Sequence, residues 1–168
     1  AVTLAADDVL TGVNVTFAST VNGAKNLTVN DSGTTTFSAV VGGTTALTSV
    51  TTDAAGATQL NGGVITTTAA QTYNDAVTLG VDTTLNGVNV TLASTVNGAK
   101  NLTVNDSGTT TFGGVVGGTT ALTSVTTNAP GTTAINGTAI TTTAAQTYND
   151  AVTLAADDVL TGVNVTFA

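Results

Sequence analysis

Short runs of branched and apolar residues alternate with polar turn residues along the whole chain, and the stretch from Asn26 to Phe37 shows this pattern most clearly. Leu27-Thr28-Val29 and Thr34 to Phe37 are separated by an Asn-Asp-Ser-Gly turn. Thr and Val are stiff, branched residues that suit a pleated strand. Gly, Asn and Asp tolerate the positive φ that tight corners need. The pattern predicts an all-β fold of short strands joined by tight turns.

The same stretch returns at Asn101 to Phe112, and the whole chain is repetitive. Residues 1–75 and 76–150 align without a gap and differ at only 15 positions. Residues 151–168 match residues 1–18 completely and begin a third copy. We therefore expect repeats at 1–75, 76–150 and 151–168 in one continuous array without a linker. Exchanges that keep an apolar residue predict interior positions, namely Phe17/Leu92, Leu60/Ile135 and Val64/Ala139.

Three shorter passes can be read within one unit, from about residue 25 to 46, 47 to 70 and 71 to 99. Their lengths of roughly 22, 24 and 29 residues fit a right-handed parallel β-helix, or β-solenoid, with about three rungs per 75-residue repeat. Rungs spaced by ~4.8 Å would give a rise of roughly 14 Å per unit. Asn101 to Phe112 would then occupy the same corner as Asn26 to Phe37, three rungs further along the axis.

Tandem small β-sandwiches are the alternative fold, because turn signals at this spacing fit them too. A closed sandwich of 75 residues needs bulky core residues, however, and the chain has no Trp and four Phe. The narrow interior of a solenoid can be filled by stacked Val, Leu, Ala and Thr. The composition therefore favours the solenoid.

The charge balance excludes several classes of partner. Ten Asp stand against Lys25 and Lys100, which gives a net charge of −8. Nucleic-acid binding is not expected, because it needs clustered Lys or Arg. Membrane insertion is not expected either, because no apolar run approaches the ~18 residues of a spanning helix. Without Cys or His, the chain has no thiolate or imidazole to offer a metal.

Catalytic chemistry has few candidate residues. The absence of His and Cys excludes Ser-His and Cys-His nucleophiles. Paired carboxylates could do acid–base work, and Asp7-Asp8 returns as Asp157-Asp158, but the middle copy has Asp82-Thr83. We therefore expect no enzyme, no catalytic, metal or cofactor-binding residue, and no cofactor.

Each candidate binding motif also has a simpler structural interpretation. Asp31 with Ser32 and Asp75 with Asn74 could bind calcium, but these residue types also cap their own turns. Tyr73 and Tyr148 could stack on sugars, although a single Tyr per unit is more typical of a core edge. Asn-x-Thr triplets match the glycosylation pattern; they begin at Asn14, Asn26, Asn89, Asn101, Asn136 and Asn164.

The high frequency of threonine makes ice binding a function to consider. A flat face of regularly spaced Thr on stacked strands could order water. The candidate triplets are 34–36, 66–68 and 141–143. Such a face needs the same Thr-x-Thr on each rung, and the passes differ within the unit. We therefore interpret these residues as exposed strand positions.

The segments 26–37, 46–53 and 70–79 together resemble repeats of large bacterial secreted surface proteins of the filamentous-haemagglutinin and autotransporter-adhesin type. The resemblance covers the whole chain and implies a secreted, β-helical structural segment at the bacterial cell surface. It implies attachment or biofilm formation, with glycans and host or abiotic surfaces as candidate partners. Because both ends lie in mid-repeat, we expect axial continuation into a filament, covalently or by stacking on another copy. A glycan- or ice-binding solenoid is the alternative function.

Overall fold

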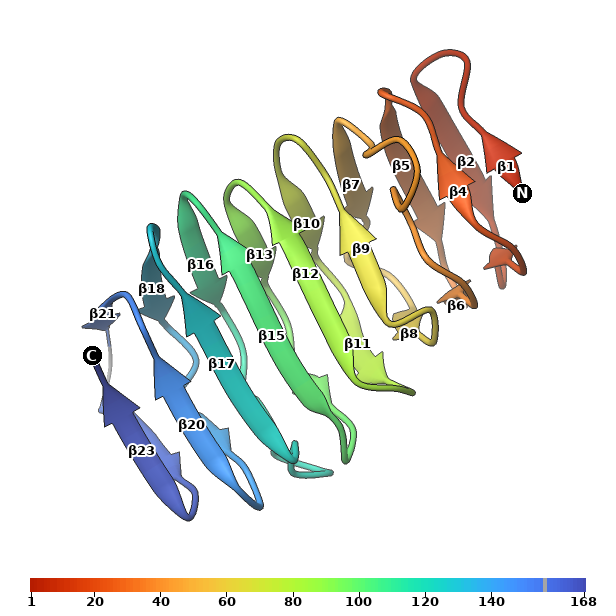
Figure 1. Cartoon of the computed structure of the whole chain (residues 1–168). Coiled ribbons are helices and arrows are strands. Elements are labelled where there is room, and N and C mark those ends of the chain that lie inside the picture. Colours follow the sequence, from red (N-terminus) through yellow and green to blue (C-terminus); the bar gives the residue numbers. More distant parts are fainter. Residues whose placement is uncertain (156) are drawn as a thin grey trace.

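The computed structural model describes residues 1–155 and 157–168 as a right-handed parallel β-helix of about eight turns. Figure 1 shows the strands stacked side by side from one end of the coil to the other, with the two termini at opposite ends. The described residues contain no helix long and apolar enough to cross a membrane. The fold class predicted from the sequence is confirmed.

Five parallel sheets line up as three columns, which form the sides of the coil and which we call sides A, B and C. Val41 bridges the two sheets of side A, and Val116 bridges the two sheets of side C. Side A contains β1 (Val2–Thr3), β4 (Val21–Asn22), β9 (Val64–Thr66), β12 (Thr83–Gly87), β15 (Asn101–Asp106), β17 (Ser124–Asn128), β20 (Ala145–Tyr148) and β23 (Asn164–Phe167). Side B contains β2 (Asp8–Gly12), β5 (Asn26–Asp31), β7 (Ser49–Thr52), β10 (Gln71–Tyr73), β13 (Val90–Leu92), β16 (Thr109–Phe112), β18 (Thr132–Ile135) and β21 (Ala151–Leu154). Side C contains β3 (Thr16–Phe17), β6 (Thr34–Phe37), β8 (Ala57–Leu60), β11 (Ala76–Leu79), β14 (Val96–Asn97), β19 (Ala139–Thr141) and β22 (Val159–Thr161).

The first two predicted passes, 25 to 46 and 47 to 70, each hold three sides of the coil, one of them formed by Val41 alone. On side A, Val41 makes a single bridge between β4 and β9. The ten strands β1 to β10 together with Val41 make eleven sides before β11 begins the second copy. At three sides per coil, one 75-residue unit holds three and two-thirds coils, slightly more than the predicted three. The third predicted pass, from residue 71 to 99, is wrong, because it holds five sides, β10 to β14, instead of three.

Because one unit does not hold a whole number of coils, corresponding strands of successive copies lie on different sides. β5 lies on side B, whereas the identical residues of β15 lie on side A. The prediction that both occupy the same corner, three rungs apart, is therefore wrong. Successive copies are related by two-thirds of a turn, and a given side is repeated after three units, or eleven coils. The rise per unit becomes roughly 18 Å instead of 14 Å on the same strand spacing.

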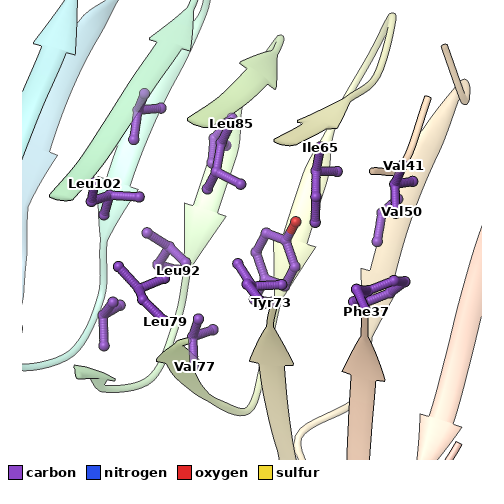
Figure 2. Packing of buried hydrophobic residues seen from close by; sticks show 14 of the residues in the cluster. Phe37, Val41, Val50, Ile65, Tyr73, Val77, Leu79, Leu85, Leu92 and Leu102 are labelled. Carbon is purple, nitrogen blue, oxygen red and sulfur yellow. The ribbon is translucent and has the colours of Figure 1, made fainter. Parts of the chain in front are cut away.

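The interior is a narrow stack of apolar side chains. Buried and outward-facing residues alternate along β5, as expected for a strand. Figure 2 shows Phe37, Tyr73 and Leu85 lying between the columns of strands, and all three are at most 1% exposed. The predicted interior exchanges are confirmed for Phe17/Leu92 and Leu60/Ile135. Val64/Ala139 is an exception, because both residues are only half-buried.

Candidate functional site

The most elaborate polar site is the buried carboxylate of Asp31, at a corner between two coils. It accepts hydrogen bonds from the backbone N–H groups of Asn14 and Val15, each at 2.7 Å, and of Gly33 at 2.9 Å. The Thr35 hydroxyl donates at 3.2 Å. Burial acts to raise the pKa of Asp31, but the three N–H groups and the hydroxyl outweigh it, so the pKa lies below its usual value.

Local backbone conformation builds this corner. Asn14 has a φ of 63°, in the left-handed region that Asn tolerates better than most residues. That turn directs two successive N–H groups at the carboxylate. The second copy repeats the geometry at Asp106, where Asn89 has a φ of 61° and donates at 2.7 Å. The corner is therefore a property of the repeat and not of one side of the coil.

A second buried carboxylate, Asp75, is bonded by hydroxyl groups instead. Thr52 donates at 2.8 Å, and Thr58 donates to both carboxylate oxygens at 3.0 and 2.8 Å. Burial raises the pKa of Asp75, the two hydroxyls offset part of this rise, and the negative charge of Asp53 adds to it. Thr127, Thr133 and Asp150 repeat the hydroxyl contacts in the second copy.

Tyr73 and Gln71 form a third buried network, which crosses between coils. The Tyr73 hydroxyl donates to Gln71 Oε1 at 3.0 Å. Gln71 Nε2 donates to the carbonyl oxygens of Ile65, at 3.3 Å, and Asn86, at 2.9 Å. Burial raises the pKa of the Tyr73 phenol. Tyr73 is fully buried, as is Tyr148, so neither ring can stack on a sugar and the core interpretation is confirmed.

Side chains on the surface form ladders between coils. Asp7 accepts bonds from the backbone N–H and side-chain amide of Asn26, both at 2.9 Å, and these contacts lower its pKa, with a smaller contribution from Lys25. Ser49 extends this ladder by donating to Asn26 at 2.7 Å. On side A, Asn side chains form a ladder in which each amide nitrogen donates to the amide oxygen of the Asn in the preceding coil, at 2.6 to 2.9 Å. This ladder consists of Asn86, Asn105, Asn128 and Asn149.

The predicted acidic candidates do not converge. Asp7 is exposed and bonded to Asn26, whereas Asp8 is half-buried at the start of β2, and neighbouring strand residues point to opposite faces. Asp31 caps its own turn through Gly33, as predicted, and also bonds the preceding coil. Asp75 accepts instead from the hydroxyls of Thr52 and Thr58, which are distant in sequence. Across residues 1–155 and 157–168, no cluster of three metal-ligating side chains occurs. No pocket opens in that part of the chain either.

The interpretation of the Thr triplets as exposed strand positions is wrong for their middle residues, Thr35, Thr67 and Thr142, which are buried. Thr34 and Thr36 pair with Ala57 and Gln59 on the next coil, so this triplet does not continue as a Thr row. The register instead aligns two other sets of Thr, which could not be derived from the sequence because the coil length was not known. The row on the outer face of side A consists of Thr84, Thr103, Thr126, Thr147 and Thr166. The row on side B consists of Thr28, Thr51, Thr72, Thr91 and Thr111.

Most of the Asn-x-Thr candidates are held by hydrogen bonds. The Asn14 and Asn89 side-chain oxygens accept from Thr34 and Thr109. The Asn26 and Asn101 amides donate to Asp residues, and Asn136 and Asn164 are exposed.

Neither the protein-family models, nor the curated proteins, nor the solved structures compared with the chain gave a match.

Proposed function

We propose that the chain is a structural, non-enzymatic repeat segment of an extracellular bacterial fibre or adhesin. The observation that supports this best is the continuity of the coil across the boundary between the two copies. Gln71 of the first copy donates to the Asn86 carbonyl of the second at 2.9 Å, and β8 of the first copy pairs with β11 of the second in an unbroken register. An array of such units grows in length without a new kind of contact.

The buried polar groups suit a mechanical role. The carboxylates of Asp31 and Asp75 are bonded to groups in neighbouring coils, so they join coils rather than face a substrate. Backbone hydrogen bonds between parallel strands run along the fibre axis. A pull along the axis therefore loads many of these bonds at once. Secretion to the cell surface and a role in attachment or biofilm follow from the sequence resemblance.

Immunogold electron microscopy of the cells that make the protein tests this proposal. Antibodies against the 75-residue unit should label thin fibres outside the cell surface. Cells treated with an external protease should lose the label while cytoplasmic marker proteins stay intact. Label confined to the cell interior would contradict the proposal.

A second candidate function is binding of ice or a glycan by the Thr row of side A. Thr103, Thr126 and Thr147 lie in register on successive coils, and the Asn ladder fixes the neighbouring side chains. Changing these three Thr to Val should abolish thermal hysteresis or retention on insoluble polysaccharide if the row binds. Changing Thr36, Thr78 and Thr141, which lie on side C outside any such row, to Val is the matched control. Equal behaviour of the two variants would rule the row out.

A further inference from the structure

Asn-Gly pairs are the places where this chain could modify its own backbone without an enzyme. They begin at Asn22, Asn61, Asn86, Asn97 and Asn136. Glycine has no side chain that would keep its backbone nitrogen away from the preceding Asn side chain. That nitrogen can attack the side-chain amide carbon of the Asn when both groups are free to move. The coil decides which of the five pairs keeps this freedom.

The pairs at Asn22 and Asn97 are equivalent positions of the two copies, and both of their reacting groups are held. In the first copy the glycine N–H donates to the Thr45 carbonyl at 3.2 Å. The Asn22 side-chain oxygen accepts from the backbone N–H groups of Thr44 and Thr45, at 2.9 and 3.2 Å. The second copy repeats these contacts, so the coil protects both pairs.

Hydrogen bonds also hold the pairs at Asn86 and Asn136. Asn86 lies inside strand β12, which is paired on both sides. Its side-chain oxygen accepts from the Asn105 amide at 2.7 Å, and its side-chain nitrogen donates to the Thr66 hydroxyl at 3.2 Å. After Asn136 the glycine is buried, and its N–H donates to the Phe112 carbonyl at 3.1 Å. Four of the five pairs are therefore restrained.

The pair Asn61-Gly62 lacks these restraints. Asn61 is exposed at the corner between β8 and β9 (Figure 1), and Gly62 is half-buried. Within residues 1–155 and 157–168, neither the Gly62 N–H nor the Asn61 side-chain amide takes part in a hydrogen bond. The Asn61 side-chain oxygen lies against Gly80 of the next coil, which has no side chain to hold it. Both reacting groups are therefore free of the contacts that hold the other four pairs.

One exchange between the two copies accompanies this difference. Gly62 is followed by Gly63, which has a φ of 77°, whereas the second copy has Thr138 there without a positive φ. Asn61 and Asn136 thus lie at corners of different backbone conformation. In the second corner the glycine N–H shares a carbonyl acceptor with the Asn136 N–H, which donates at 2.9 Å. Two successive glycines also make the first corner more flexible.

We propose that Asn61 is a site of spontaneous deamidation, selected from the five pairs by the coil and by Gly63. The Gly62 backbone nitrogen gives up its proton and bonds to the side-chain amide carbon of Asn61. The bond from that carbon to the amide nitrogen breaks, and the nitrogen leaves as ammonia with the proton, so a succinimide ring forms. Water then opens the ring at either carbonyl, which gives aspartate or isoaspartate.

The two products change the corner differently. Aspartate adds one negative charge to a chain whose net charge is already −8. Isoaspartate adds a carbon atom to the main chain beside Gly62, which packs so closely on Ala39 that a Cβ atom would collide with the Ala39 carbonyl oxygen. The isoaspartate form should therefore unfold at a lower temperature than the aspartate form.

Mass spectrometry tests the proposal on the 168-residue chain after incubation in warm, mildly alkaline buffer and digestion. Replacement of the amide NH2 by OH raises the mass of a peptide, and fragmentation locates the residue. In the folded chain Asn61 should react about tenfold or more faster than the other four Asn, which must first lose hydrogen bonds. In chain unfolded by guanidinium chloride, all five should react at similar rates, because the coil no longer distinguishes them.

Thr138→Gly and Gly63→Thr exchange the corner residues of the two copies and form a matched pair of variants. Thr138→Gly should raise the rate at Asn136 towards that of Asn61, and Gly63→Thr should slow Asn61. If circular dichroism shows that Gly63→Thr does not fold, Thr138→Gly alone decides the role of Gly63. Asn61→Gln should remove the fast reaction, because the longer side chain would have to close a larger ring.

A folded wild-type chain in which Asn61 reacts no faster than Asn136 would overturn the site. A fast reaction at Asn61 together with an unchanged rate at Asn136 in Thr138→Gly would overturn the role of Gly63. None of these outcomes depends on where the protein is located, so the proposed fibre function is tested separately.

Discussion

Asp31 and Asp75 are both buried, yet their pKa values shift in opposite directions. Three backbone N–H groups converge on Asp31 and stabilise its charged form, whereas Asp75 receives only hydroxyl groups and lies near Asp53. The number and kind of hydrogen-bond donors thus decide whether burial or bonding dominates. At the residue scale, the charged form of Asp31 stabilises a corner of the coil, whereas burial disfavours the charged form of Asp75.

Asp31→Asn should destabilise the fold by about 2 kcal/mol or more, because charge-assisted bonds are lost and the amide nitrogen faces buried N–H donors. Urea unfolding followed by circular dichroism measures the change. Asp157→Asn, at an exposed position, should remain within about 0.5 kcal/mol of wild type, as expected for a surface exchange. Equal effects of the two substitutions would contradict the role assigned to the Asp31 corner.

The raised pKa of Asp75 predicts a pH effect of definite sign. The folded state takes up a proton at a higher pH than the unfolded state, whose Asp pKa is about 3.9. The contribution of Asp75 to stability is therefore lowest at neutral pH and increases as the pH falls through the folded pKa. Asp75→Asn should remove this increase between pH 7 and about pH 4 in urea unfolding. An unchanged slope would show that the Asp75 carboxylate titrates normally.

The contribution of Asp31 to stability changes with pH in the opposite direction. Because its folded pKa is lowered, its contribution is present above the unfolded value of about 3.9 and is lost as the pH falls through the folded pKa. The two residues together predict a stability maximum in mildly acidic solution. A wild-type profile that only rises towards neutral pH would contradict this combination.

At the scale of the element, a single residue can form one side of the coil. Val41 forms its side with single bridges to Val21 and Ile65. The chain turns directly afterwards at Gly42, where φ is 72° and a Cβ atom would collide with the Thr66 carbonyl oxygen. Gly117 repeats both features against Thr141. Backbone conformation therefore fixes the coil where strand length does not.

Gly42→Ala should lower the stability by about 1–3 kcal/mol, the cost of a strained backbone residue. The neighbouring Gly43→Ala is the control, because Gly43 does not have a positive φ and its Cβ would meet only the Val40 side chain. Thermal melts of both variants compare the two effects. A smaller loss for Gly42→Ala than for Gly43→Ala would contradict this account of the corner.

Sequence patterns predicted the long strands and failed at the short ones. The alternation in Leu27-Thr28-Val29 is visible because the strand is six residues long and half-buried. The two-residue strand β14 gives no such signal, so the end of the third coil and the register could not be derived. The Asp31 site was predicted only as a turn, because Asn14 and Val15 lie 17 and 16 residues away and only the coil brings them near. Long-range register is what the sequence alone does not show.

At the scale of the whole molecule, the mismatch between unit and coil distributes each feature around the axis. The ladder that begins at Asp7 in the first copy is repeated from Asp82 in the second, two-thirds of a turn away. The same holds for the Asp31 and Asp106 corners. In a long array, a given feature of the unit therefore appears on each of the three sides in turn. It returns to the same side only after three units. This distribution around the axis fits a fibre that makes contacts on all sides better than a protein with one binding face.

Helical reconstruction by cryo-electron microscopy of a longer tandem array of the 75-residue unit tests the continuous coil most directly. The structure predicts a rise of roughly 18 Å per unit, from three and two-thirds coils at ~4.8 Å each, with a rotation near two-thirds of a turn. Globular beads would contradict it, and so would a rod whose units rise by roughly 14 Å without rotation.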